Sequence, residues 1–384
     1  MPKRIGFLYE KMVDREFIRN VIYDASRGRR KRFDIEPVLA DIDNRVEEMY
    51  ALLRDGTFKP SPGKTKLIYD VSSEKPRSLT IVPFWPDAIV QWCVVTVLKP
   101  IILRGMSPWS CASIPGRGCR RVRAHIQEVM HRDPENTRYC AELDIKKFYP
   151  SIPLDKLIGA LRHKIKDERL LELVHRMLAP YGPGLPIGFY LCQWLANFYL
   201  EPLDHLIMDQ PGVKYMTRHM DNLVLFGSSS SGLHAARIAI VQFVQERLAL
   251  TIKANWQIFP TRARRVAAVG YRYSATNTIL RKRNFLRLTR QCRRVRKKQR
   301  RGMKISFAQA SGIISRIGQL QHCNSRTTMH KYVQPLDTEQ LKEVIRNESK
   351  RRQRTGTRIH HRSDSQPIRQ SSGSLLREPA PLQH

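Results

Sequence analysis

Two aspartates in apolar surroundings are the residues of this sequence whose type and placement could do chemistry. Asp144 lies in "LDIKKFYPSI", where apolar neighbours predict a buried strand. Asp221 lies in "KYMTRHMDNLVLFG", whose pattern predicts a β-hairpin with Asp221 and Asn222 at its turn. A buried carboxylate is unfavourable unless it is hydrogen-bonded or binds a metal, so each aspartate alone could be structural. On adjacent strands of one sheet, the pair could hold two Mg²⁺ ions that activate a 3′-hydroxyl and stabilise a leaving pyrophosphate.

The segments that would position these aspartates alternate between strand and helix. A helical region is predicted up to about residue 60. It is followed by two short strands, "GKTKLIYD" and "PRSLTIVPF", and by an amphipathic helix in "WPDAIVQWCVVTVLKPII". One long helix is predicted in "GFYLCQWLANFYLEPLDHLI", and short strands in "LTIKAN" and "VAAVGYRYS" come after the hairpin. The pattern predicts an α+β fold built around an antiparallel sheet.

Charge is the unusual feature of the composition. The 384 residues contain 68 Lys and Arg against 34 Asp and Glu, a formal net charge of +34, while the hydrophobic fraction of 41% is ordinary. Such a surface should attract a polyanion and bind it with strong salt dependence, although a merely soluble basic protein could have the same composition.

Membrane association and disulfide bonding are not expected. No apolar stretch approaches the roughly 18–20 residues of a membrane-spanning helix, so no membrane partner is predicted. The N-terminus lacks the apolar core of a signal peptide, which indicates a cytoplasmic protein. Seven cysteines without a CxxC pair indicate reduced thiols, not a disulfide framework or a zinc site.

A strongly basic segment follows the predicted sheet. Residues 285–304 combine a rough helical spacing of apolar residues with a high density of Arg and Lys. This could be a solvated charged face, but it also suits contact with a phosphate backbone. Phe285 is its one aromatic residue, so the segment lacks a platform for stacking bases and favours a duplex or a structured RNA. The residues expected to contact nucleic acid are Arg293, Arg294, Lys297 and Lys298.

Seven short motifs occur in an order that resembles a known family. The finger motifs of a reverse transcriptase are matched by "KPRSLTIVPFWPDAIVQWCV" and "SCASIPGRGCRR". Its palm motifs are matched by "LDIKKFYPSI", "GLPIGFYLCQWLANFYLEPLD", "RHMDNLVLFG", "LALTIKANWQIFP" and "VGYRY". The likeness extends from about residue 5 to about residue 340. It is nearest to the prokaryotic branch of diversity-generating retroelements and defence-associated, abortive-infection-like reverse transcriptases.

The resemblance implies a right-hand polymerase fold of fingers, palm and thumb. Along this chain it implies an N-terminal helical region at 1–60, fingers at 61–139, and a palm of antiparallel sheet flanked by helices at 140–275. A basic helical thumb at 276–345 and a disordered polar tail at 346–384 complete the expected organisation.

The resemblance also implies a set of catalytic and metal-binding residues. Asp144 and Asp221 would be ligands of two Mg²⁺ ions, assisted by the backbone carbonyl of Ile145 and the amide oxygen of Asn222. Lys253 lies where a general acid would protonate pyrophosphate, although a solvated lysine is an equal alternative.

The nucleotide would be bound by residues from both fingers and palm. Lys75 and Arg77 match finger residues that neutralise the triphosphate, and "VGYRY" matches the primer grip. Gly188 and Gln193 match the motif in which the backbone closely approaches the incoming base. Tyr149 falls where a bulky ring excludes a 2′-hydroxyl and favours dNTPs, but a packed strand aromatic would fit the local pattern equally well.

Four departures from the family pattern bear on activity. Asn222 replaces a second aspartate, and His219 replaces the usual aromatic residue of that hairpin. Large residues fill 189–192, where small or hydroxyl residues are common, and the expected Arg and His are missing near Ala88 and Trp92. Specialised substrate handling or loss of activity could each produce these departures. An asparagine keeps an oxygen ligand but removes one negative charge, so we expect weaker Mg²⁺ binding at a site that retains its minimal aspartate pair.

The expected function is RNA-directed DNA polymerisation, in which cDNA is made from dNTPs by two-metal nucleotidyl transfer. The template is expected to be a dedicated, structured noncoding RNA, and the expected setting is antiphage defence. No RNase H or endonuclease domain is obvious after the thumb, so an accessory protein or a second reverse transcriptase subunit is an expected partner. Two alternatives remain open: a diversity-generating retroelement enzyme with an accessory protein, and a catalytically silent RNA-binding subunit of a larger complex.

Overall fold

The computed structural model describes residues 4–70 and 75–355. Within these residues, helices precede the first strand, in agreement with the helical region predicted there. Asp14 caps the second helix of this region by accepting a hydrogen bond from the Phe17 N–H at 2.7 Å. The helices are α1 (Leu8–Met12), α2 (Arg15–Ser26), α3 (Glu36–Ala40) and α4 (Ile42–Arg54).

β1 (Lys64–Asp70) and β2 (Lys75–Ile81) form the antiparallel hairpin that the sequence predicts. Much of β1 faces solvent, and Tyr69 is 61% exposed. The base of the hairpin is fixed where the Thr80 N–H donates to the Ile187 carbonyl at 2.8 Å. The hairpin is therefore a projecting element with an anchored base.

A π-helical turn, η1 (Phe84–Ala88), leads into α5 (Ile89–Gly105). Among the described residues, Phe84–Gly105 is the one helix long and apolar enough to cross a membrane, which corrects the expectation that no stretch qualifies. The predicted amphipathic face is also wrong, because buried side chains surround α5 on most sides. α5 packs against α2 and α10 (Tyr190–Tyr199), so a central place in the protein core explains its apolar composition.

The strand at the first aspartate is shorter than predicted. β3 (Tyr139–Asp144) ends at Asp144, and a short helix, α7 (Phe148–Ser151), begins after Lys147, whose φ is +46°. The long helix predicted downstream is divided into α10 and α11 (Glu201–Met208), because Pro202 has no N–H to continue the first helix. The other helices of this region are α6 (Cys119–Arg132), α8 (Leu154–Lys164), α9 (Glu168–Leu178) and η2 (Ala179–Tyr181).

The central sheet has the strand order β4-β5-β3-β6, and all its pairs are antiparallel. The hairpin turns at Met220 and Asp221, so the predicted turn at Asp221 and Asn222 is displaced by one residue. Met220 has φ +56°, the positive value that tight two-residue turns require. The remaining bounds are β4 (Tyr215–His219), β5 (Asn222–Gly227), α12 (Ser230–Glu246) and β6 (Gln257–Pro260).

The C-terminal part combines a small antiparallel sheet with helices. Apolar side chains at the predicted helical spacing are buried along α13, including Leu288, Cys292 and Val295. The elements are β7 (Val266–Ala268), β8 (Tyr271–Tyr273), β9 (Thr278–Leu280), α13 (Lys282–Arg300), α14 (Phe307–Leu320), α15 (Arg326–Thr328), η3 (Met329–Val333) and α16 (Thr338–Thr355).

The predicted start of the disordered tail, at residue 346, is wrong. α16 continues without a break through residues 346–355, which were predicted to belong to the tail. The rest of the predicted tail, 356–384, lies outside the described residues.

Successive residues of the central sheet enter two different hydrophobic cores. Leu143 and Leu223 belong to a core shared with the N-terminal helices, α5 and α10. Cys140 and Val224 belong to a second core shared with α6, α13 and α14. The alternation arises because neighbouring side chains of a strand point to opposite faces. Asp144 follows Cys140 by an even number of residues and so shares the face of the second core.

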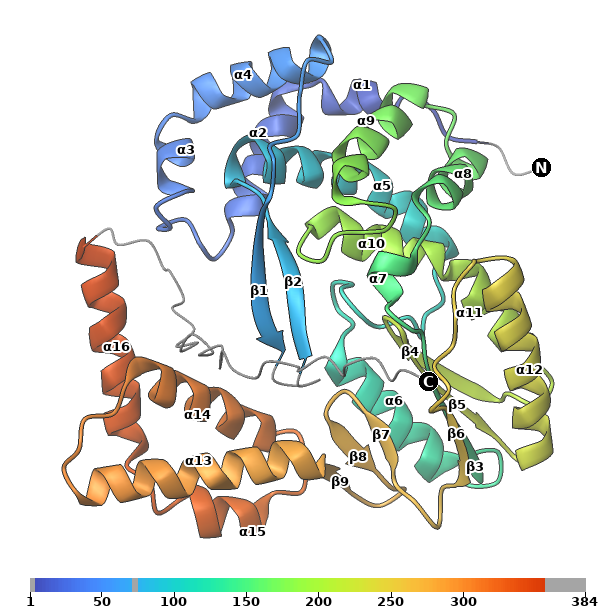
Figure 1. Ribbon diagram of the computed structural model, residues 1–384, viewed down its shortest axis with the longest axis vertical. Helices are drawn as coiled ribbons and strands as arrows, with labels where there is room; N and C mark the ends of the chain where they lie inside the picture. Colours follow the sequence, from blue (N-terminus) through green and yellow to red (C-terminus); the bar gives the residue numbers. More distant parts are fainter. Residues whose placement is uncertain (1–3, 71–74, 356–384) are drawn as a thin grey trace, which may run out of the picture.

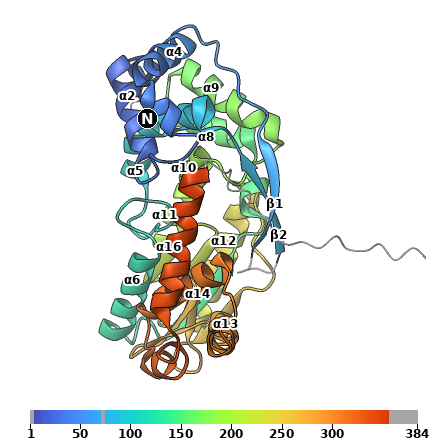
Figure 2. The ribbon, with the colours of Figure 1, turned by 90° about the vertical axis from the view of Figure 1, so that its left-hand side faces the viewer.

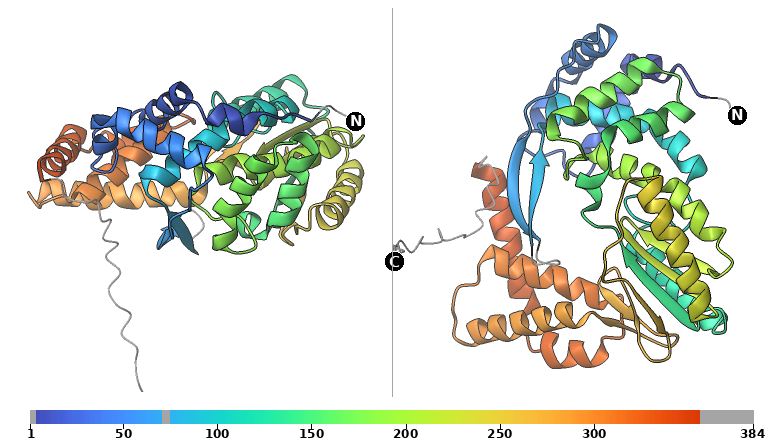
Figure 3. Two further views of the ribbon diagram at one scale, coloured as in Figure 1. Left: turned by 90° about the horizontal axis from the view of Figure 1, so that it is seen from above. Right: turned by 45° about the vertical axis from the view of Figure 1, so that its right-hand side comes forward.

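Figure 1 shows these elements in three groups along an arc. The first contains α1–α5 and α7–α10 with the projecting hairpin, the second contains the central sheet with α6, α11 and α12, and the third contains β7–β9 and α13–α16. Figure 2 shows the molecule from its narrow side, with α16 along the near face. In Figure 3 the hairpin projects toward α13 and α14. This arrangement agrees with the predicted right-hand fold.

Candidate active site

Antiparallel pairing of β3 with β5 brings the two aspartates together. Asp144 lies opposite Asn222, and the Ile145 N–H donates to the Asp221 carbonyl at 3.1 Å. Asn222 is exposed, and its side-chain amide donates to Asp221 Oδ1 at 3.0 Å. Two carboxylates and one amide therefore meet at one edge of the central sheet.

Burial and the neighbouring charges together set the pKa of the Asp221 carboxyl, which is raised. Burial raises the pKa of Asp221, and the neighbouring Asp144 carboxylate raises it further. The cations Lys253 and Arg77 lower that pKa. Because the ionised form is disfavoured by its surroundings, a bound cation would stabilise it.

Lys253 reaches the aspartates through main-chain pairing. The sequence predicts a strand here, but the segment makes only an isolated bridge between Ile252 and Ile145. The Lys253 N–H donates to the Asp144 carbonyl at 2.8 Å, and its Nζ lies 2.7 Å from Asp144 Oδ1. That oxygen is buried and lacks a hydrogen bond of good geometry, so the contact with Lys253 is an ion pair.

The oxygen atoms at this edge fit a hard divalent cation. Mg²⁺ prefers carboxylate, amide and carbonyl oxygens, and a buried carboxylate oxygen without a hydrogen bond is an atom that a metal would satisfy. Across residues 4–70 and 75–355, no three His, Cys, Asp or Glu side chains gather as a metal site. A metal would therefore depend on the carboxylates of Asp144 and Asp221 together with neutral oxygens. The candidates for the neutral ligands are the Asn222 amide oxygen and the Ile145 carbonyl.

Tyr149 lies beside the hairpin turn, in α7 and not in the predicted strand. Its hydroxyl contacts Met220 Sδ at 3.7 Å, and its ring packs edge-on against Phe148 with centroids 5.6 Å apart. Burial raises the pKa of Tyr149, and Cys192 and Asp221 add to the rise. The ring is therefore neutral and close to the aspartate pair.

Gly188 marks the junction between the finger hairpin and α10. Its φ is +120°, and a Cβ at this position would clash with the Thr80 carbonyl on β2. The close approach of the backbone at Gly188 in the structure is to β2, and its approach to an incoming base stays a prediction. Gln193 lies half-buried in α10, where its carbonyl accepts a hydrogen bond from Asn197 Nδ2 at 3.2 Å.

The two predicted finger cations both belong to β2. Arg77 lies opposite Ile68 in the hairpin register. Although burial raises the pKa of Asp221, Arg77 is near enough to lower it, which connects the hairpin electrostatically with the central sheet. Lys75 is the first residue of β2 and lies farther from the anchored base.

The four basic residues predicted to contact nucleic acid differ in their surroundings. Arg294 and Lys297 are exposed on α13. Arg293 lies over the Tyr332 ring, 5.4 Å from its centroid. Lys298 donates to a glutamine of α14 at 3.0 Å and so connects two thumb helices. Arg294 and Lys297 are thus the better placed of the four for contact with a phosphate backbone.

Arg218 also lies at this site, although it is not among the predicted site residues. It precedes the hairpin turn, is fully buried and forms an ion pair with Asp204 at 2.6 Å. A signal was present, because an arginine inside an apolar strand needs a buried partner.

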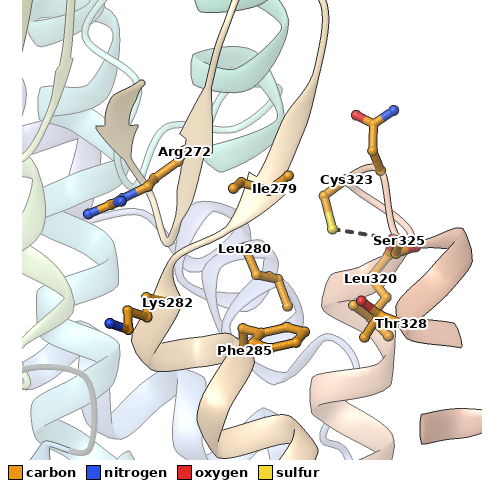
Figure 4. Close-up of a pocket in the computed structure, with 10 residues that line it drawn as sticks. Arg272, Ile279, Leu280, Lys282, Phe285, Leu320, Cys323, Ser325 and Thr328 are labelled. Carbon is orange, nitrogen blue, oxygen red and sulfur yellow. Dashed lines mark hydrogen bonds between the residues drawn. The ribbon is translucent and has the colours of Figure 1, made fainter. Parts of the chain in front are cut away.

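A cavity of about 300 Å³ lies at the base of the thumb. Figure 4 shows Leu280 and Phe285 on one side and Leu320 and Thr328 on the other. The Asn324 N–H donates to a β9 carbonyl at 2.7 Å, which holds the adjoining loop against the small sheet. Arg272, from the "VGYRY" motif matched to the primer grip, lines this cavity, whereas Asp144, Asp221 and Lys253 do not, so the cavity is separate from the aspartate site.

Comparison with known families shows to which protein family the chain belongs. The family model described as reverse transcriptase (RNA-dependent DNA polymerase) matches residues 44–271. That range is more than half of the chain and includes Asp144, Asp221 and Lys253. The chain belongs to the reverse transcriptase family.

Similar curated proteins are encoded in introns. The group II intron-encoded protein LtrA of Lactococcus lactis subsp. cremoris is 30% identical over 176 residues, which cover 43% of this chain and 28% of that protein. An uncharacterized 91 kDa protein in the cob intron of Schizosaccharomyces pombe is 32% identical over 173 residues, which cover 42% of this chain and 21% of that protein. The matched region spans less than a third of the length of either relative.

Solved structures give a more distant likeness. Telomerase from Candida tropicalis, in complex with the TWJ fragment of telomeric RNA, is 12% identical with a TM-score of 0.46 over 70% of this chain and 54% of that chain. A partial Cas6-RT-Cas1–Cas2 complex is 18% identical with a TM-score of 0.35 over 62% of this chain and 42% of that chain. At these TM-scores the two structures add no detail about the site.

Proposed function

We propose that this chain is an RNA-directed DNA polymerase that makes cDNA from dNTPs. The observation that carries the proposal is the convergence of Asp144, Asp221 and Lys253 at one sheet edge, with Arg77 near enough to act on Asp221. Membership of the reverse transcriptase family supports the same function. A silent RNA-binding subunit would gain nothing from a lysine and two aspartates held together in this way.

Two Mg²⁺ ions would be held by Asp144 and Asp221, with the Asn222 amide oxygen and the Ile145 carbonyl as further ligands. When bound, such ions activate a primer 3′-hydroxyl and stabilise the leaving pyrophosphate. Lys253 would donate a proton from Nζ to that pyrophosphate, since its ammonium lies beside Asp144.

Other residues would hold and select the nucleotide. Lys75 and Arg77 would neutralise the triphosphate from the finger side. Tyr149 would exclude a 2′-hydroxyl, because its ring lies next to the turn that carries Asp221. Gly188 and Gln193 would shape the opposite wall through the placement of α10 against β2.

Primer extension tests the proposal directly. The purified chain should extend a DNA primer annealed to an RNA template with dNTPs and Mg²⁺. Asp144→Asn and Asp221→Asn should each abolish extension while leaving RNA affinity and thermal unfolding near those of the wild type. Asp155→Asn, at an exposed aspartate of α8, is the matched control and should extend normally. Full activity in either site variant would refute the assignment of these residues.

We propose that the enzyme acts in the cytoplasm in antiphage defence, on a dedicated structured noncoding RNA, with an accessory protein or a second reverse transcriptase subunit. The unusual residues His219 and Asn222 and the large side chains at 189–192 support a specialised substrate. Two other settings are candidates. The intron-encoded relatives make an intron RNA a possible template, and a diversity-generating retroelement would supply a template repeat.

Purification from the native operon, followed by sequencing of bound RNA and DNA, separates these settings. We expect an RNA encoded beside the gene together with cDNA complementary to it. Phage challenge of cells carrying wild type or Asp221→Asn should show protection only by the wild type. Intron sequence or a repeat template in the bound RNA would replace the defence setting, and a wild type inert with its own RNA and partners would refute the activity.

A further inference from the structure

Arg218 is a buried charge directly beside the turn that carries Asp221. Both Arg218 and its partner Asp204 are 0% exposed. Burying an ion pair costs more free energy than its attraction returns unless the geometry is good and the remaining donors and acceptors are satisfied. A charged pair at this place therefore needs a structural reason.

The guanidinium uses each of its five N–H donors. Nε and Nη2 donate to the two carboxylate oxygens of Asp204 at 2.6 and 2.7 Å. Nη2 also donates to the Ser110 hydroxyl at 2.6 Å. Nη1 donates to Asn197 Oδ1 at 3.0 Å and to the Met220 carbonyl at 3.2 Å. A lysine could not make this set of bonds, because its donors all come from one nitrogen.

The main chain of Arg218 is held as firmly as its side chain. Its N–H donates to the Trp109 carbonyl at 2.9 Å, and its carbonyl accepts a hydrogen bond from the Cys111 N–H at 2.8 Å. Residues 109–111 therefore pair with β4 and fix the main chain from which the Arg218 side chain extends.

The partners of Arg218 belong to the elements that would hold the metal and the nucleotide. Met220 is the first residue of the turn, and Asp221 is the second. Asn197 lies on α10, and its amide also donates to the carbonyls of Gln193 at 3.2 Å and Ala112 at 2.9 Å. One side chain thus joins the Asp221 turn to the helix that carries Gln193.

We infer that Arg218 is a positioning residue that fixes the Met220 carbonyl, and through it Asp221, relative to α10. The inference rests on the proposed function, since it assumes that Asp221 binds a divalent cation. Loss of the guanidinium would release this anchor of a strained two-residue turn, and the Asp221 carboxylate would lose its fixed placement beside Asp144. Metal binding should weaken, whereas RNA binding by the thumb should not.

Two variants separate this role from general stability. Arg218→Lys keeps the charge opposite Asp204 but cannot also reach Asn197 and the Met220 carbonyl. The double variant Arg218→Met/Asp204→Leu replaces the buried pair by apolar side chains of similar volume, an exchange that often preserves stability. The matched control is Arg162→Met, which removes an exposed bidentate pair with Glu168.

The main readout is Mn²⁺ binding followed by electron paramagnetic resonance, which does not depend on polymerisation. Each Arg218 variant should bind Mn²⁺ about tenfold more weakly, the lower end of what residues that orient metal ligands contribute. RNA affinity should stay within about twofold of the wild type, and Arg162→Met should match the wild type in both measurements. An Arg218 variant with normal thermal unfolding and normal Mn²⁺ affinity would overturn the inference.

Hydrogen exchange on the wild type provides a second test that needs no variant. Amides of residues 215–222 should exchange as slowly as those of α10 and much more slowly than those of the 64–81 hairpin. Fast exchange at 215–222 would also overturn the inference. The proposed function fails separately: if Mn²⁺ binds and Asp221→Asn abolishes that binding, but the wild type incorporates no dNTP, the positioning role stands and polymerisation does not.

Discussion

Lys253 Nζ lies 2.7 Å from Asp144 Oδ1, so an ammonium group stands where a metal ion would approach that carboxylate. The two side chains are 38% and 29% exposed, and solvent therefore weakens their attraction. Main-chain pairing between the same two residues, at 2.8 Å, keeps the lysine there. Lys253 thus balances the negative charge of one of the two carboxylates.

Removing this ammonium should separate metal binding from catalysis. Lys253→Met should bind Mn²⁺ several-fold more tightly, because a positive charge that opposes the metal is gone. It should also incorporate dNTPs more slowly, because the proton donor to pyrophosphate is lost. Mn²⁺ titration and single-turnover primer extension measure the two effects, with exposed Lys156→Met as the control. Weaker metal binding combined with normal extension would contradict both roles.

Asn222 provides a test of whether the site works with one charge fewer. Asn222→Asp should preserve extension and lower the Mg²⁺ concentration for half-maximal rate, since a carboxylate strengthens the field at the ions. The substitution removes the amide that donates to Asp221 Oδ1 at 3.0 Å. Complete loss of activity would therefore mean that this hydrogen bond is required. Absence of extension by both the wild type and Asn222→Asp at every Mg²⁺ concentration would indicate a site that no longer functions.

Tyr149 should govern the choice between dNTPs and rNTPs. Tyr149→Ala removes the ring beside Met220 and should raise rNTP incorporation relative to dNTP incorporation by about 5- to 150-fold, if the ring supplies one steric contact worth roughly 1–3 kcal/mol. Tyr149→Phe is the control, because it keeps the ring and loses only the hydroxyl contact with sulfur. An unchanged ratio in Tyr149→Ala would make Tyr149 a packing residue.

The thumb should contribute measurably to the salt dependence of RNA binding. Neutralising Arg294 and Lys297 to glutamine should reduce the slope of log K against log salt by about 1.4–1.8, since each phosphate contact adds roughly 0.7–0.9. The charge-matched control is Arg15→Gln/Arg19→Gln on α2. Equal slopes for the thumb variant and the wild type would identify α13 as a solvated face.

His125 should make the fold sensitive to acid. Burial lowers the pKa of His125 to about 4, and its ring stacks on Trp109 with centroids 3.4 Å apart. An unfolded histidine has a pKa of about 6.5, so between these values the unfolded chain binds more protons and stability falls as pH falls. The contribution of His125 to the free energy of unfolding falls by about 3 kcal/mol across this window.

Thermal unfolding at pH 7 and pH 4.5 measures this effect. His125→Phe keeps an aromatic ring against Trp109 and should lose less stability on acidification than the wild type. An equal loss in both proteins would assign the acid sensitivity to other groups.

Asp144 lies opposite Asn222 and therefore next to Asp221. This proximity could be predicted because alternation along each strand leaves little freedom in how two apolar strands align. The division between α10 and α11 was also available in the sequence, as Pro202 marks it. The displaced hairpin turn was not, because a positive φ at Met220 carries no signature in a residue type that rarely adopts it.

The bonds of Arg218 could not be predicted for a different reason. Its partners Asp204, Asn197 and Ser110 lie 14, 21 and 108 residues away along the chain. No local pattern indicates which distant side chains will satisfy a buried guanidinium, and only the assembled fold brings them together. The amphipathic face predicted for α5 is wrong for a similar reason, because only the assembled fold brings α2 and α10 against this helix.

The second hydrophobic core has a consequence for how the protein matures during translation. Val224 on the sheet, Leu288 on α13 and Ile313 on α14 belong to that one core. While α13 and α14 are still inside the ribosomal exit tunnel, the side of the sheet that carries Asp144 has no cover from them. The nascent chain therefore leaves exposed the part of this apolar face that α13 and α14 cover in the folded protein, until both thumb helices have emerged.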